Sequence, residues 1–202
     1  GADAVFWNRR YEPVIIARDQ QVEAALRAAG LQTECGNGAL LHEPETIRNR
    51  AGQPFRVFTP FWRTCLAASE PAAPLPAPRK LTAPPRRPVS LPLAALELEP
   101  KLNWADGLRA AWQPGSAGAN AELQRFLRDS LLAYDEGRNR PDRVGTSRLS
   151  PHLHFGEISP RQVWQAVRRF AESQSIPAAG WRRWQFLTEL GWREFAHHLL
   201  FH

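Results

Sequence analysis

A stretch crowded with proline, from Ser69 to Pro100, divides the chain into two parts of different character. Proline fixes the backbone angle φ and lacks an N–H donor, so prolines at this density block both helix and sheet. They favour an extended linker. We therefore expect a domain boundary here, with a first domain at 1–68, a linker at 69–101 and a second domain at 102–202.

The part before the linker shows the pattern of a strand, a helix and a second strand. Residues 4–7 are apolar and predict the end of a buried strand. Asp19 is a suitable N-cap for a helix over 20–29, and Gly30 suits its C-terminal stop. A short strand is expected at 31–35. This succession predicts the back half of an α/β sheet, whose front half is not in the chain.

Helical patterns begin just before the linker and dominate everything after it. A short helix is expected from Pro60 to Leu66, and a longer one carries an apolar face from Ala119 to Tyr134. Ser159-Pro160-Arg161-Gln162 reads as a capping box with proline at the first helical position, opening a helix to about Phe170. A last helix is expected from Trp181 to the end. Because no strand pattern follows the linker, the second domain is predicted to be all-α.

The charge of the chain favours an anionic partner. The net charge is +6 and the sequence isoelectric point is about 10.3, which favours nucleic acid first. An arginine-rich composition inherited from a GC-rich genome would explain the same charge. Four basic residues lie among the prolines of the linker, where they either contact DNA phosphates or simply keep the linker solvated: Arg79, Lys80, Arg86 and Arg87.

Cysteine content and hydropathy indicate the cellular compartment in which we expect the protein. Cys35 and Cys65 are too few for a disulfide framework or a zinc site, and they predict two buried free thiols, with a bridge between them as the alternative. No run approaches the ~20 apolar residues of a membrane span, and no signal peptide is visible. We expect a cytoplasmic protein. The chain has no Met, so we also expect an internal fragment of a longer protein, with a trimmed single domain as the alternative.

A run of hydroxyls precedes a proline in the second domain. Thr146, Ser147 and Ser150 offer hydroxyls and backbone N–H groups just before Pro151, which is what a bound phosphate needs at a helix start. Arg148 adds a positive charge, unless its side chain pairs with a carboxylate. Taken alone, the run is better explained as a plain helix N-cap.

A second run, from Trp184 to His198, repeats aromatic and acidic residues at helical spacing. Glu189 and Trp192 are three residues apart and therefore share a helix face, where a Trp ring can stack on a nucleic-acid base. Any one Trp is more often a core residue. Four histidines do not share helix faces in pairs, so no metal site is expected: His152, His154, His197 and His198.

Three motifs together resemble one protein family. Val57–Phe61, Gly145–Pro151 and Glu189–Phe195 occur in the same order in the DNA photolyase/cryptochrome family, and the chain is most like its bacterial cyclobutane pyrimidine dimer photolyases. The resemblance implies an α/β chain segment that is the C-terminal part of a Rossmann-like antenna domain. The Pro-rich linker and the start of an all-α FAD-binding domain would follow. A monomer is implied, because the family's site is built within one polypeptide.

The resemblance assigns an FAD site to this chain. It implies that the hydroxyl-bearing loop holds the FAD phosphates together with Tyr134, and that Arg193 lies against the flavin or a nearby phosphate. Phe186 stands where the family has a Trp, which keeps an apolar wall and loses the indole donor. The implied cofactor residues are Tyr134, Thr146, Ser147, Arg148, Leu149, Ser150, Phe186 and Arg193.

It also assigns a site for UV-damaged DNA. Trp192 would stack on a flipped-out pyrimidine dimer, since a lesion inside the duplex is out of reach. Glu189 would hydrogen-bond the thymine edge, and Arg138 would lie near the DNA backbone. The implied activity is light-driven dimer repair by electron transfer from reduced FAD. The alternatives are a cryptochrome without repair activity, a (6-4) photolyase, and a helical nucleic-acid-binding module without a cofactor.

An antenna chromophore, folate or deazaflavin, is also implied. Tyr11-Glu12 matches the folate-binding members, but Val14 and Ile15 stand where these have an Asn-Glu pair, so the known folate contacts are incomplete. The rest of the flavin site and its tryptophan electron chain are expected beyond His202. The 202-residue chain alone is therefore expected to bind FAD poorly and not to repair DNA.

Overall fold

The computed structural model describes residues 2–82, 89–102 and 104–202. Part of the predicted linker, including Pro84, Pro85, Arg86, Arg87 and Pro88, lies outside the described residues.

The first part folds as a small parallel unit. Strands β1 (Ala4–Asn8) and β2 (Gln32–Gly36) pair in parallel, with Ala4 opposite Gln32, and α1 (Pro13–Ala28) connects them. This confirms the expected strand, helix and strand. The expectation that the first strand is buried is wrong for this chain, since Phe6 is 70% exposed.

Helix α1 begins earlier than predicted. Its first residue is Pro13, because proline's fixed φ suits the first helical position and its missing N–H costs nothing there. Asp19 is therefore not an N-cap; it lies inside the helix and pairs with Arg18 at 2.6 Å. The predicted stop is confirmed, since Gly30 has a φ of 81° and the N–H of Leu31 bonds back into the last turn.

The remaining elements are helical in the described residues. A 3₁₀ turn, η1 (Pro44–Thr46), leads to α2 (Phe58–Ala67), and a second turn, η2 (Leu93–Leu96), lies in the linker. After it come α3 (Asp106–Ala111), α4 (Gly115–Asp129), α5 (Tyr134–Gly137), α6 (Ser150–His154), α7 (Pro160–Ser173), α8 (Ala178–Trp181) and α9 (Gln185–Phe201).

Several predicted helix ends need correction. Helix α2 begins at Phe58, so Pro60 lies in its first turn, where a missing N–H is tolerated. Helix α4 ends at Asp129 instead of running to Tyr134, because the Ser130 hydroxyl donates to the carbonyl of Val144 at 3.0 Å and the chain turns. The last helix begins at Gln185 rather than at Trp181.

The capping box is confirmed. The N–H of Gln162 donates to the Ser159 hydroxyl at 3.2 Å, and the N–H of Ser159 donates to the Gln162 side chain at 2.8 Å. The helix it opens continues three residues past Phe170, to Ser173.

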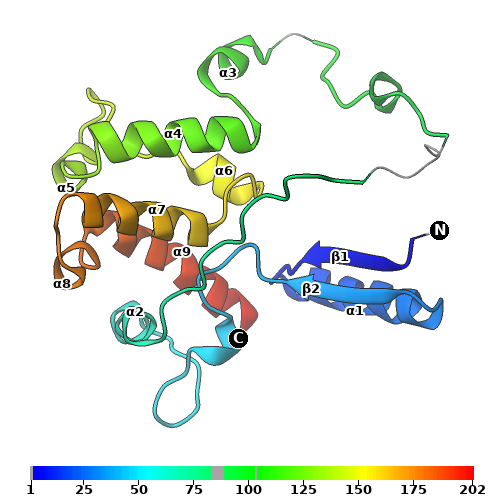
Figure 1. Cartoon of the computed structure of the whole chain (residues 1–202), viewed down its shortest axis with the longest axis horizontal. Helices are drawn as coiled ribbons and strands as arrows, with labels where there is room; N and C mark the ends of the chain where they lie inside the picture. Colours follow the sequence, from blue (N-terminus) through cyan, green and yellow to red (C-terminus); the bar gives the residue numbers. More distant parts are fainter. Residues whose placement is uncertain (1, 83–88, 103) are drawn as a thin grey trace.

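One apolar core joins the helices. Residues of α2, α4, α7 and α9 share a single buried cluster, and Leu41 and Ile47, from before α2, belong to it. Figure 1 shows the parallel unit on one side, the helices on the other, and the segment after β2 crossing between them. The predicted boundary at residue 68 therefore marks a change of sequence within a shared core. The domain limits themselves stay a prediction.

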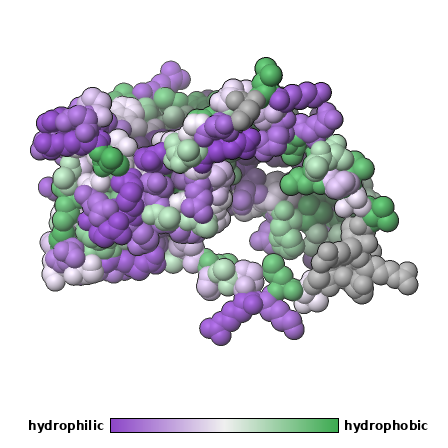
Figure 2. Space-filling view, turned by 90° about the horizontal axis from the view of Figure 1, so that it is seen from above, coloured by the Kyte–Doolittle hydropathy of each residue, from purple (hydrophilic) through white to green (hydrophobic). Residues whose placement is uncertain are grey.

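Contacts with α7 and with the end of α8 hold the start of the predicted linker in place. Glu70 accepts a hydrogen bond from the Trp164 indole at 2.8 Å and pairs with Arg182. Farther along, Leu75, Leu81 and Val89 are exposed. The helical end of the face in Figure 2 is mostly hydrophilic. None of the described helices is long and apolar enough to cross a membrane.

Candidate functional site

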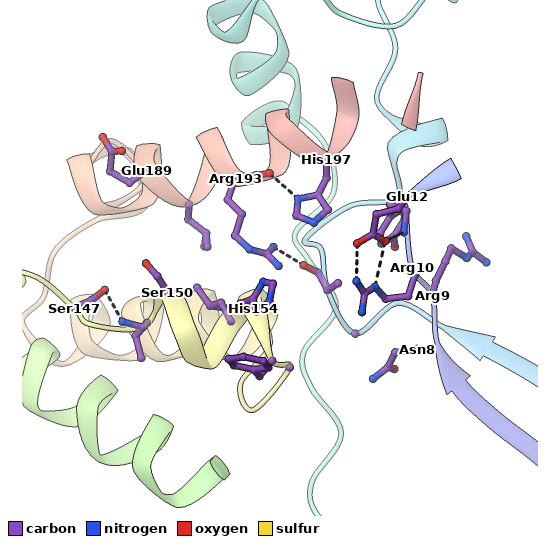
Figure 3. A pocket seen from close by; sticks show the side chains of 18 of the residues that line it. Asn8, Arg9, Arg10, Glu12, Ser147, Ser150, His154, Glu189, Arg193 and His197 are labelled. Atoms are coloured by element: carbon purple, nitrogen blue, oxygen red, sulfur yellow. Dashed lines mark hydrogen bonds and ion pairs between the residues drawn. The ribbon is translucent and has the colours of Figure 1, made fainter. Parts of the chain in front are cut away.

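A cavity of about 580 Å³ lies between α6, α9 and the loops that follow β1 and β2. Figure 3 shows Ser147 and Ser150 on one side, Arg193 and His197 on α9 above them, and Asn8, Arg10 and Glu12 at the far end. Seven of the predicted site residues line it: Tyr134, Ser147, Leu149, Ser150, Phe186, Glu189 and Arg193. Four others are not among its lining residues: Arg138, Thr146, Arg148 and Trp192.

The hydroxyl-bearing loop, Thr146–Ser150, is held by side chains outside the cavity. The carbonyl of Thr146 accepts a hydrogen bond from Arg125 at 3.0 Å, and the Ser147 hydroxyl accepts one from the N–H of Leu149 at 3.3 Å. Leu149 is buried. The loop shape is thus fixed while Ser147 and Ser150 line the cavity.

Arg148 points away from the cavity. Its φ is 54°, in the left-handed region, and its guanidinium donates to the carbonyl of Ala111 at 2.8 Å. The guanidinium carbon lies 4.3 Å from the centre of the Trp112 ring, which is a cation–π contact. Instead of the carboxylate that was the alternative partner, Arg148 contacts a carbonyl and an aromatic face, and it ties the loop to the end of α3.

An aromatic wall closes one end of the cavity. The Phe186 ring lies 4.5 Å from that of Phe126 and 5.4 Å from that of Tyr134, centre to centre. Burial raises the pKa of the Tyr134 hydroxyl above its ordinary value. The Phe186 ring is tilted by 51° from the Phe126 ring and by 82° from the Tyr134 ring, so the rings form an apolar wall that can contact a ring system.

Arg193 brings a mostly buried positive charge to the cavity. It donates to the carbonyl of Ala39 at 2.6 Å, which links α9 to the loop after β2. Burial lowers the pKa of its guanidinium, against the raising effect of the neighbouring Glu194 carboxylate. His197, one turn along, faces the Arg193 carbonyl at 3.0 Å.

Glu194 is a buried acidic residue next to the cavity-lining Arg193, and sequence reasoning did not single it out. It is 4% exposed, and its Oε2 accepts a hydrogen bond from the N–H of Leu41 at 2.9 Å. Burial raises the pKa of this carboxyl to about 8, although Arg193 and backbone donors oppose the shift. The available signal was its spacing: Glu194 falls four residues after Leu190 and four before His198, on the core face of the helix.

Glu189 and Arg138 bind each other. Arg138 Nη1 contacts Oε1 of Glu189, and Nε2 of Gln185 donates to the same oxygen at 2.7 Å. The sequence placed both residues on the DNA side without indicating this pair. The structure therefore links the candidate lesion contact to the candidate backbone contact.

Trp192 stacks on an aromatic ring of α2. Its ring lies 3.8 Å from that of Phe58 with an angle of 10° between the planes, and the residue is 47% exposed. It lies on α9 together with Glu189, but it is not among the residues that line the cavity. One indole face is held by Phe58, which fixes the orientation of the ring.

The histidines have other partners. Nε2 of His198 accepts from the N–H of Phe55 at 3.0 Å, and burial lowers its pKa to about 4. Nδ1 of His152 lies 2.5 Å from Glu157. In the described residues, no three His, Cys, Asp or Glu side chains gather as a metal site would need. Cys35 and Cys65 are free thiols.

The far end of the cavity carries a polar network. The Tyr11 hydroxyl donates to Glu43 at 3.2 Å, and Arg9 reaches the same carboxylate at 3.0 Å. Glu12 lines the cavity and pairs with Arg10 at 2.6 Å, which holds the pKa of its carboxyl at about 2. Of the residues compared with folate-binding proteins, Tyr11 and Glu12 line the cavity, and Val14 and Ile15 are not among its lining residues.

Known proteins match this arrangement over the whole chain. The DNA photolyase family model matches residues 1–79. The deoxyribodipyrimidine photo-lyase of Agrobacterium fabrum is 44% identical over 206 residues, covering 100% of this chain and 42% of that protein. The chain belongs to the DNA photolyase/cryptochrome family. Cryptochrome-1 of Arabidopsis thaliana is 34% identical, over 100% of this chain and 30% of that protein.

A solved photolyase has the same fold. The crystal structure of a bacterial class III photolyase from Agrobacterium tumefaciens superposes with a TM-score of 0.91 at 44% identity, covering 100% of this chain and 41% of that one. The small parallel sheet with many helices is thus a photolyase/cryptochrome fold, as predicted. The chain spans about two fifths of the length of these photolyases.

Proposed function

We propose that the whole protein is a DNA photolyase that binds FAD and repairs cyclobutane pyrimidine dimers with blue light. The observation that carries the proposal is the cavity, which Ser147 and Ser150 line together with the α9 residues Phe186, Glu189 and Arg193. The photolyase from Agrobacterium fabrum is also more similar to the chain than the plant cryptochrome is, at 44% against 34% identity.

The residues of the cavity fit FAD. A pyrophosphate needs hydrogen-bond donors and positive charge, which Ser147, Ser150 and Arg193 supply, and a flat ring needs an apolar wall, which Tyr134 and Phe186 supply. When bound and reduced, FAD supplies the light-excited electron. The residues of this chain would bind it, orient it and exclude water. Thr146 and Leu149 would act through their backbone, and Arg148 by holding the loop.

The DNA side of the proposal uses three residues. Trp192 would stack its exposed face on a flipped-out pyrimidine dimer, with Phe58 holding the opposite face. Glu189 would accept a hydrogen bond from the thymine edge, and Arg138 would lie against a DNA phosphate. UV-damaged DNA is the proposed partner and a monomer the proposed state.

The finer domain scheme belongs to the same proposal. Residues 1–68 would be the end of a Rossmann-like antenna domain, 69–101 the linker, and 102–202 the start of the all-α FAD-binding domain. The proposal also includes an antenna chromophore, a folate or a deazaflavin, and the end of the cavity near Glu12 is its proposed place.

The competing function is a cryptochrome, which would use the same cofactor without repair. It is favoured by the 34% identity to Cryptochrome-1 over the whole chain. A (6-4) photolyase is the other alternative, and the lesion that it repairs separates it from the main proposal.

The test uses the whole protein with reduced FAD and an oligonucleotide that contains a thymine dimer, in blue light and in darkness. We expect light-dependent restoration of the thymines, lost in Trp192→Ala and reduced in Glu189→Ala. Trp104→Ala is the matched control, because Trp104 is 69% exposed and does not line the cavity. A protein loaded with FAD that leaves dimers intact in the light would contradict the proposal. Repair of a (6-4) product instead would change the lesion.

A further inference from the structure

The two charged residues of the proposed DNA side neutralise each other in this structure. Arg138 Nη1 contacts Oε1 of Glu189, and Gln185 adds a second donor to that oxygen at 2.7 Å. A carboxylate that already accepts from a guanidinium and an amide has lost part of its capacity for a base edge. Likewise, a guanidinium bound to a carboxylate is not free for a phosphate.

The backbone presents Arg138 at a fixed place. Arg138 follows the short helix α5, its N–H donates to the carbonyl of Tyr134 at 3.0 Å, and its guanidinium carbon lies 5.7 Å from the centre of the Tyr134 ring. The next loop packs tightly here, since a Cβ at Gly145 would meet the carbonyl oxygen of Gly137 at 2.3 Å. The backbone of Arg138 is therefore held in place, and only its side chain can change from one anionic partner to another.

The direction of Glu189 agrees with this picture. Figure 3 shows its carboxylate turned away from Ser147, Ser150 and the guanidinium of Arg193, although the residue lines the cavity. The side chains of Arg138 and Glu189 are 29% and 30% exposed. A solute can therefore reach both.

We propose that Arg138 and Glu189 form a latch that a DNA phosphodiester opens. A guanidinium binds phosphate oxygens in the same two-pronged way as it binds a carboxylate, so a phosphodiester arriving at this rim competes for Arg138. Once Arg138 turns to the phosphate, Glu189 keeps only its contact with Gln185 and accepts a hydrogen bond from the base. This inference rests on the proposed function, because it places DNA at this rim of the site.

The latch predicts that two variants change the affinity for undamaged DNA in opposite directions. Glu189→Gln removes the competing charge and frees Arg138, so we expect undamaged DNA to bind about two- to fivefold more tightly, the range for a partly exposed ion pair. Arg138→Gln removes the phosphate contact, so binding weakens and the dependence on log salt falls by about one unit of slope. The double variant should bind like Arg138→Gln alone.

The experiment measures binding of undamaged duplex by the FAD-loaded whole protein, in darkness and at several salt concentrations. The matched control is Arg140→Gln, which removes a nearby positive charge paired with Asp142. Its effect should be the same with Glu or Gln at position 189. Tighter binding by Glu189→Gln that disappears in the double variant supports the latch.

Other outcomes overturn the latch. If Glu189→Gln binds undamaged DNA no more tightly than the unchanged protein, the ion pair is merely structural. If Arg138→Gln loses FAD without a change in DNA affinity, the phosphate in question is the cofactor's. Because binding is measured in darkness on undamaged DNA, failure of the latch is separate from failure of repair, which the light assay reports.

Discussion

At the scale of single residues, Arg148 shows how a charged side chain can serve a site without entering it. Its left-handed backbone aims the guanidinium at Trp112 and Ala111, outside the cavity. We expect Arg148→Ala to lower the free energy of unfolding by about 1–2 kcal/mol, from the lost cation–π contact and hydrogen bond. Arg148→Gly loses the same contacts but relieves a φ of 54°, so it should be at least as stable as the alanine variant.

Urea denaturation of the two Arg148 variants measures this difference. An alanine variant with unchanged stability and lost FAD would contradict the structural role. It would place Arg148 against the cofactor, as the family resemblance implies.

Glu194 predicts a pH dependence of stability. Its carboxyl titrates near 4.5 when unfolded and at about 8 when folded, so between these values the folded state keeps a proton that the unfolded state has released. Its stabilising contribution is complete below pH 4.5 and is lost as pH rises toward 8. The loss is at most about 1.4 kcal/mol per pH unit in that window.

Glu194→Gln isolates this effect, because the amide oxygen can still accept from Leu41. We expect urea denaturation between pH 5 and pH 8 to show a flatter pH dependence in the variant. The comparison is needed because His42, His197 and His198 have lowered pKa values and contribute the opposite slope. Parallel curves for the two proteins would show that Glu194 keeps its ordinary pKa.

The sequence could indicate which residues line the site, but it could not indicate which other residues they contact. Tyr134, Ser147, Phe186 and Arg193 do line the cavity. Loop chemistry indicated Ser147, and the family resemblance implied the other three. Glu194 binds Leu41, which is 153 residues away in the chain. A pairing of that kind depends on how helices pack, so periodicity carries no trace of it.

At the scale of elements, the signals that worked were those with a stereochemical mechanism. The capping box at Ser159 and the glycine stop at Gly30 both appear as predicted. The start after Asp19 was wrong because Pro13 supplies an equally good start earlier. The end of α4 was missed because Leu131 and Tyr134 continue the apolar spacing after the helix has ended at Asp129.

Gly191 marks the closest approach of two elements. A Cβ on Gly191, in α9, would meet the Trp62 ring of α2 at 2.7 Å. We expect Gly191→Ala to lower the free energy of unfolding by about 1–3 kcal/mol, since the rigid indole must move and helix propensity recovers only about 1 kcal/mol. The measurement is again urea denaturation.

Gly107→Ala is the control for Gly191, because nothing lies within 4 Å of a Cβ on Gly107, in α3. It should leave stability unchanged or raise it. Equal effects of the two substitutions would show that α2 gives way and that the approach is not a constraint.

At the scale of the whole molecule, the segment between β2 and α2 connects the parallel unit to the helices, which the predicted linker separates in sequence. Leu41 is bound by Glu194, and Ala39 by Arg193, so neighbouring residues of α9 hold the loop that borders the cavity. Composition predicted a linker from the change in sequence, but it could not reveal that residues before this stretch enter the helical core. The cavity therefore has walls from both sides of the predicted boundary.

The same geometry limits what this chain can do alone. Its cavity holds a hydroxyl-bearing loop and one face of α9, and the chain spans about two fifths of the photolyases that it resembles. We expect the isolated chain to bind FAD at least about tenfold more weakly than the whole protein, a difference of about 1.4 kcal/mol, and to repair no dimers. Equilibrium dialysis measures both affinities, with circular dichroism to establish that the isolated chain is helical.

Phe186→Ala should weaken the residual binding further, because it opens the aromatic wall beside Tyr134. Tight, stoichiometric FAD binding by a folded isolated chain would instead mean that these walls suffice for the cofactor.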